Sequence, residues 1–171
     1  MVTKSTIPTH EWSLKNTPVQ IDYKQYVSKT IAVLVGVSAE CGVDMVMTYD
    51  KSVNIPKFKI FLEELRRRYF FDDLCIYMDN LSVHISNAVK ERLEELSIKC
   101  IYAPVYSPEY NPIEFCFSVA KGMIKRERLE AILHEKKIDL VKVIHRSFDR
   151  IKRESINNCV THSLRLLNNF N

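Results

Sequence analysis

Two acidic residues are placed so that each carboxylate can reach the same end of a sheet. Asp79 directly follows an apolar run, and Glu114 follows a segment punctuated by prolines, with 34 residues between them. Carboxylate oxygens are the ligands that hard divalent cations such as Mg²⁺ prefer. The pair therefore predicts a metal-dependent phosphoryl-transfer site that acts on nucleic acid.

Each of these two residues also has a purely local explanation. An Asp-Asn pair after a strand is common turn chemistry, because both side chains bond their own backbone. A glutamate in the first turn of a helix is favoured by the helix dipole and by free N–H groups. It is the occurrence of both residues at this spacing, more than either one alone, that favours a site.

The hydrophobic pattern predicts an α/β fold with a mixed sheet flanked by helices. Asn54 is the expected cap of one helix, and residues 80–82 offer caps for the next. A third helix is expected to begin at Pro112 or Ile113, and residues 137–170 form one long helix or two broken near 154–158. The predicted strands cover residues 30–38, 43–49, 73–79 and 98–103.

Composition is that of one folded domain over residues 1–171, with 46% hydrophobic and 27% charged residues. The net charge of +4 permits a nucleic-acid partner without demanding one. Five cysteines without CxxC spacing indicate neither a zinc site nor a disulfide framework. No membrane span is predicted, so we expect an intracellular protein, nuclear in a eukaryote and cytoplasmic in a bacterium.

Two strings carry a resemblance to a known family. They are Asp79-Asn80-x-x-x-His84 and Tyr106-Ser-Pro-Glu-Tyr-Asn-Pro-Ile-Glu114, separated by an apolar run. Together they resemble the catalytic core of mariner-type and related insertion-sequence transposases. These are DDE superfamily endonucleases with a ribonuclease-H-like fold, and the spacing of 34 residues is that of one major branch. We expect that fold here.

The resemblance implies that Asp79 and Glu114 are the second and third of three carboxylates that hold two Mg²⁺ or Mn²⁺ ions. Such enzymes cut and rejoin DNA at transposon ends and work as homodimers, without a small-molecule cofactor. Matching motif positions assign a site-shaping role to five residues, namely Asn80, His84, Pro108, Asn111 and Pro112. Basic clusters offer candidate DNA contacts at Arg66, Arg67, Arg68, Lys121, Lys125 and Arg126.

The first carboxylate of the family is the important departure. It is expected at or just before Met1, on a first strand that this chain is predicted to lack, as for an N-terminally truncated catalytic domain. Asp22 is the best substitute, whereas Asp44 and Asp50 are expected to be turn residues. We therefore expect weak or no catalysis. The alternative is a non-catalytic DNA-binding or protein-interaction module derived from a transposase, which would bind DNA independently of metal.

Overall fold

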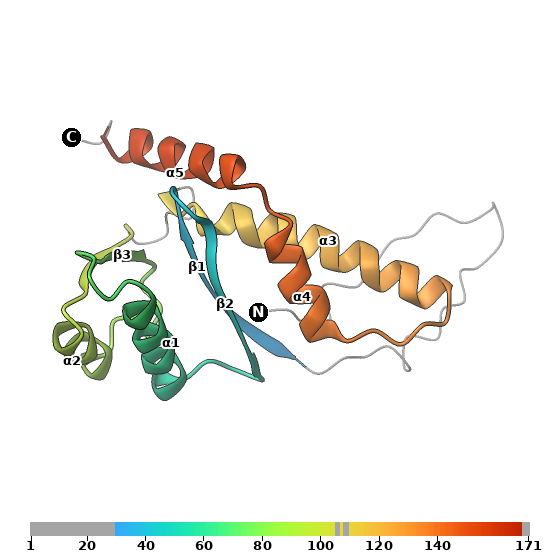
Figure 1. Ribbon diagram of the computed structural model, residues 1–171, viewed down its shortest axis with the longest axis horizontal. Helices are drawn as coiled ribbons and strands as arrows, with labels where there is room; N and C mark the ends of the chain where they lie inside the picture. Colours follow the sequence, from blue (N-terminus) through green and yellow to red (C-terminus); the bar gives the residue numbers. More distant parts are fainter. Residues whose placement is uncertain (1–29, 105–106, 108–109, 169–171) are drawn as a thin grey trace.

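A β-hairpin runs through the middle of the fold in the computed structural model, which describes residues 30–104, 107 and 110–168 (Figure 1). Strand β1 (Ile31–Ser38) pairs antiparallel with β2 (Gly42–Asp50). Gly42 closes the turn at φ 82°, where a Cβ would lie 3.3 Å from Arg153, so glycine suits this position. Both predicted strands are confirmed.

The second sheet is also a pair of strands. β3 (Cys75–Met78) lies parallel to β4 (Lys99–Tyr102), with Met78 opposite Tyr102. Within the described residues no strand joins this pair to the hairpin. Within the described residues, the expected mixed sheet is thus present as an antiparallel pair and a parallel pair of strands, and the lack of a first strand stays a prediction.

Five helices of the described residues surround the strands, and two of them begin where the sequence predicts. The Asn54 Oδ1 atom accepts a hydrogen bond from the Lys57 N–H at 3.2 Å and caps the first helix. None of the helices in the described ranges is long and apolar enough to cross a bilayer. The helices are α1 (Ile55–Arg68), α2 (Asn87–Glu95), α3 (Ile113–Leu133), α4 (Leu140–Asp149) and α5 (Arg153–Asn168).

Three sequence predictions are wrong in detail. Helix α2 begins at Asn87 and is not capped by residues 80–82, because residues 81–85 form a turn in which the Ile85 N–H bonds the Leu81 carbonyl. The C-terminal helices break at 150–152, before the predicted 154–158. Asp44 is a buried residue inside strand β2 and not a turn residue.

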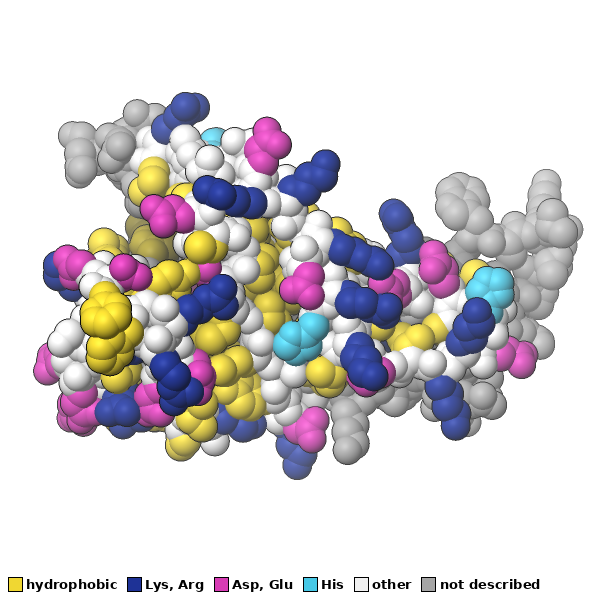
Figure 2. Space-filling model, viewed as in Figure 1, with side chains coloured by type: hydrophobic (Ala, Val, Ile, Leu, Met, Phe, Trp, Pro, Cys, Tyr) yellow, Lys and Arg dark blue, Asp and Glu magenta, His cyan; other side chains and the backbone are white. Residues whose placement is uncertain are grey.

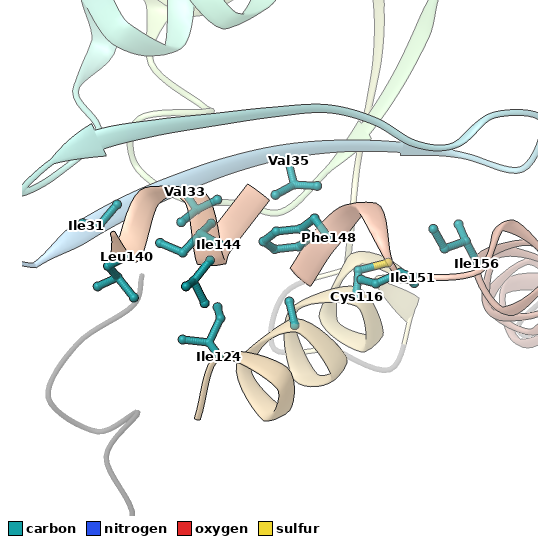
Figure 3. Close-up of a cluster of buried hydrophobic side chains, with 12 residues drawn as sticks. Ile31, Val33, Val35, Cys116, Ile124, Leu140, Ile144, Phe148, Ile151 and Ile156 are labelled. Atoms are coloured by element: carbon teal, nitrogen blue, oxygen red, sulfur yellow. The ribbon is translucent and has the colours of Figure 1, made fainter. Parts of the chain in front are cut away.

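The hydrophobic core has two parts, one on each face of the hairpin, because successive strand side chains point to opposite faces. Val33 and Val35 face helices α3, α4 and α5 in what we call the α3–α5 cluster (Figure 3). Leu34 faces the other way, toward the buried Leu62 of helix α1, in the α1–α2 cluster. That second cluster also receives Met78 of β3, so helix α1 packs against strands of both sheets.

Candidate functional site

Asp79 lies directly after strand β3, with its side chain 42% exposed. Its Oδ1 atom lies 2.6 Å from Nδ1 of His84 and accepts a second, longer hydrogen bond from the Leu81 N–H at 3.4 Å. Because a carboxylate accepts and does not donate, Nδ1 of His84 carries the hydrogen. No described residue bonds the Oδ2 atom, which leaves one carboxylate oxygen available to an external group.

His84 is held through both its ring and its backbone. Its centroid lies 4.4 Å from that of Phe58 on helix α1, and its side chain is only 13% exposed. The Tyr102 hydroxyl of β4 donates to the His84 carbonyl at 3.2 Å. Sequence reasoning did not find Phe58 or Tyr102 as supports of the site. Both are far from the motif along the chain, and only the packing of α1 and β4 brings them to it.

Asn80 fastens the end of β3 to the segment that leaves β4. Its Nδ2 atom donates to the Ala103 carbonyl at 2.5 Å, and the Ala103 N–H donates to the Met78 carbonyl at 2.8 Å. The chain therefore begins its path toward helix α3 right beside Asp79. Ten residues later it reaches Ile113, where α3 begins.

Glu114 is exposed in the first turn of α3. Its N–H donates to the Asn111 carbonyl at 3.1 Å, and Asn111 Oδ1 accepts from the Ile113 N–H at 3.3 Å. Pro112, at φ −62°, has the backbone angle that starts a helix. Asn111 and Pro112 thus set the position of Glu114, while Pro108 lies outside the described residues.

Asp79 and Glu114 are the two candidate metal ligands that the described residues contain. No group of three or more His, Cys, Asp or Glu side chains that could hold an ion occurs in the described ranges. No contact links Asp79 to Glu114 there, so their convergence stays a prediction. Their oxygens nevertheless suit a hard divalent cation, because both carboxylates are accessible and Asp79 has a free oxygen.

The other aspartates do not supply a third ligand in the described structure. Asp44 is buried and accepts a hydrogen bond from the Tyr69 hydroxyl at 2.6 Å. Burial and this bond raise the pKa of Tyr69 well above its usual range. Asp50 is exposed at the end of β2, opposite Ile31. Asp22 lies outside the described residues.

The candidate DNA-binding residues fall into two groups. Arginines at the end of α1 are engaged within the protein: Arg66 donates to the Asp72 carbonyl at 3.0 and 3.1 Å, Arg67 pairs with Glu64 and Arg68 bonds the Asp44 carbonyl. Side chains on α3 are freer. Lys121 lies over the Phe117 ring, and two exposed residues have no ion pair within the described chain, namely Lys125 and Arg126.

More cations gather beside these α3 residues. Figure 2 shows Lys and Arg side chains spread over the region of α3 and α4. Arg146 on α4 and Arg150, which directly follows this helix, both reach Glu127 of α3, at 2.9 and 3.0 Å. A hollow of about 450 Å³ lies against α4, and its polar lining is mostly basic, with Lys137, Lys142, His145 and Arg146.

Comparison with known proteins gave one family and a set of solved structures. The family model described as DDE superfamily endonuclease matches residues 1–134. A search of curated proteins gave no significant match. The Mos1 transposase catalytic domain with raltegravir and Mn is 16% identical, with 81% of this chain and 80% of that chain covered and a TM-score of 0.58.

Two further Mos1 structures are similar. The catalytic domain with raltegravir and Mg gives 15% identity, 81% coverage of each chain and a TM-score of 0.57. The paired-end complex with the left transposon end gives 19% identity and a TM-score of 0.53; it covers 90% of this chain and 50% of that one. At these identities the likeness shows a shared fold, which confirms the predicted ribonuclease-H-like architecture.

Proposed function

The chain belongs to the family of DDE superfamily endonucleases, and from this premise we propose that it is a transposase catalytic domain whose substrate is DNA at transposon ends. The observation that carries the proposal is that one family match spans both Asp79 and Glu114. Its support in the fold is that β4 leaves the sheet beside Asp79 and leads to the helix that bears Glu114. A DNA substrate implies an intracellular location, the nucleus in a eukaryote.

Asp79 and Glu114 are the residues that would hold divalent cations, Mg²⁺ or Mn²⁺. When bound, such ions activate the attacking oxygen and stabilise the leaving oxygen of an in-line displacement at phosphorus. The chain's own contribution is to orient the two carboxylates. His84 and Leu81 hold one oxygen of Asp79, while Asn111 and Pro112 set the start of the helix that carries Glu114.

We further propose that this 171-residue chain cleaves DNA weakly or not at all. Two carboxylates leave a pair of divalent ions short of ligands and of negative charge. The described residues bring no third acidic group to the site. This proposal concerns the chain of 171 residues. The assembly that this chain would join is a homodimer that brings two DNA ends together.

A nicking assay tests the catalytic proposal. The purified chain is incubated with supercoiled plasmid DNA carrying the terminal repeats of its element, with Mg²⁺ or Mn²⁺. We expect little or slow nicking, and we expect Asp79→Asn and Glu114→Gln each to remove what there is. Asp50→Asn is the matched control, since Asp50 is exposed at the far end of β2. Efficient cleavage that survives Asp79→Asn would contradict the proposed site.

A second candidate function is metal-independent DNA binding, favoured by the free cations of α3. Lys125 and Arg126 are exposed and have no ion pair in the described chain. Binding through phosphates alone weakens steeply with salt and does not respond to divalent metal beyond ionic strength. Fluorescence anisotropy with duplex DNA at low and moderate salt separates the two functions. DNA binding that tightens with Mn²⁺ and requires Asp79 supports the catalytic site. DNA binding that is lost only in the double variant Lys125→Ala/Arg126→Ala supports the non-catalytic DNA-binding module.

A further inference from the structure

We propose that His84 is the positioning residue of this site: its Nδ1–H fixes the Oδ1 atom of Asp79 and thereby presents Oδ2 to the divalent cation. The inference rests on the proposed function, because it concerns how the same carboxylate is oriented. His84 itself touches neither ion nor DNA in this proposal. It acts only through Asp79.

The two oxygens of Asp79 have different surroundings. Oδ1 receives a short bond from His84 at 2.6 Å and a long one from the Leu81 N–H at 3.4 Å. Oδ2 receives none from the described residues, although the side chain is 42% exposed. A hydrogen bond to one oxygen selects one rotation of the carboxylate and leaves the other oxygen free to bind an external group.

The His84 donor is held by contacts to both its ring and its backbone. Phe58 is 4% exposed and its ring lies tilted against the imidazole, with 4.4 Å between the centroids, so a turn of the His84 ring toward solvent would lose this contact. The backbone of His84 is bound by the Tyr102 hydroxyl. Because Asp79 is already held in one orientation, it loses little side-chain freedom when it binds an ion.

The geometry also excludes the Nδ1 atom of His84 as a metal ligand in its own right. Its Nδ1 atom faces Asp79 Oδ1 and carries the hydrogen, so that nitrogen has no lone pair to offer an ion. Groups that hold a metal-binding side chain in place typically contribute 10–100-fold to metal affinity. A role in packing alone would instead affect stability and leave the affinity of the folded protein unchanged.

Metal affinity distinguishes these roles. Mn²⁺ binding by the full chain is measured by electron paramagnetic resonance, together with thermal unfolding, for wild type and variants. We expect His84→Leu to weaken Mn²⁺ binding about 10–100-fold, and His84→Asn to retain most of the affinity because its amide nitrogen lies near the position of Nδ1. The matched control is His162→Leu, at an exposed position on α5, which should change nothing.

Two results would overturn the inference. One is an unchanged affinity in folded His84→Leu; the other is an equal loss in His84→Leu and His84→Asn, which would assign the effect to ring packing. Asp79→Asn checks the underlying function separately: if it leaves Mn²⁺ binding unchanged, the proposed metal site is wrong.

A second measurement tests His84 without metal. Nitrogen-15 NMR of the neutral form of the imidazole should show the tautomer protonated at Nδ1. Asp79→Ala should shift that signal or redistribute the tautomers. A ring protonated at Nε2 in the wild type would contradict the proposed bond, whatever the metal measurements give.

Discussion

Asp44 and Asp79 both carry a carboxylate, but their different surroundings give the two residues different roles. Asp44 is 8% exposed and its Oδ1 atom is occupied by the Tyr69 hydroxyl, so it is committed to joining β2 to the end of α1. Asp79 keeps an accessible oxygen while its other oxygen is fixed by His84. A carboxylate can take part in phosphoryl transfer only in the second situation.

The bond between Tyr69 and Asp44 leads to a prediction about stability. Tyr69→Phe removes the only donor that the described residues offer to the buried Asp44 carboxylate, so we expect a loss of about 1–3 kcal/mol in the free energy of unfolding near pH 8. Urea denaturation of both proteins measures it. Tyr49→Phe is the matched control, because the Tyr49 hydroxyl makes only weak contacts, at 3.3 and 3.4 Å.

The pH dependence of this difference follows from the raised pKa of Tyr69. A phenol whose pKa is raised on folding contributes its full stabilisation below the unfolded pKa of about 10, and loses it as pH rises toward the folded value. The cost of Tyr69→Phe should therefore be constant from pH 7 to 9 and shrink above pH 10. A cost that grows above pH 10 would mean that the hydroxyl does not bind Asp44 as a neutral donor.

Among the elements, helix α1 depends on a cap that the sequence already indicates. Asn54→Ala leaves the Lys57 N–H without its side-chain acceptor, and we expect a loss of about 1 kcal/mol in the free energy of unfolding. Asn54→Asp retains the acceptor and should lose much less. Urea denaturation gives both values. Equal losses in the two variants would show that the cap contributes nothing to α1.

The helices and strands that could be predicted are those whose sequence signals lie within a few residues of the element. The four strands and the starts of α1 and α3 follow from apolar runs and from Asn54 and Pro112, all read within a few residues. The start of α2 was misplaced because the turn at 81–85 uses the same polar residues that cap helices. The Asp79–Glu114 pair came from motif spacing. The contact of His84 with Phe58 could not be predicted from the sequence, because it depends on how helix α1 packs.

In the whole molecule, the hairpin is shared by both parts of the core. Val33 and Val35 belong to the α3–α5 cluster, whereas Leu34 packs into the α1–α2 cluster. Alternate residues of one strand therefore serve opposite faces, and neither cluster can lose its packing without exposing strand β1 to solvent. Within the described residues no strand bridges the two sheets, so the shared hairpin and helix α1 join them.

Such sharing predicts that the described fold unfolds as one cooperative unit. Ile144→Ala, at a fully buried position of the α3–α5 cluster, should cost about 2–5 kcal/mol. The same loss should appear in hydrogen exchange of the slowest amides in α1, which is in the other cluster. Leu62→Ala, also fully buried, should act reciprocally on α4. Ile60→Ala, at a position 47% exposed, is the control and should change little. If each core variant lowered protection only in its own cluster, the two halves would be independent units, and the hairpin would not couple them.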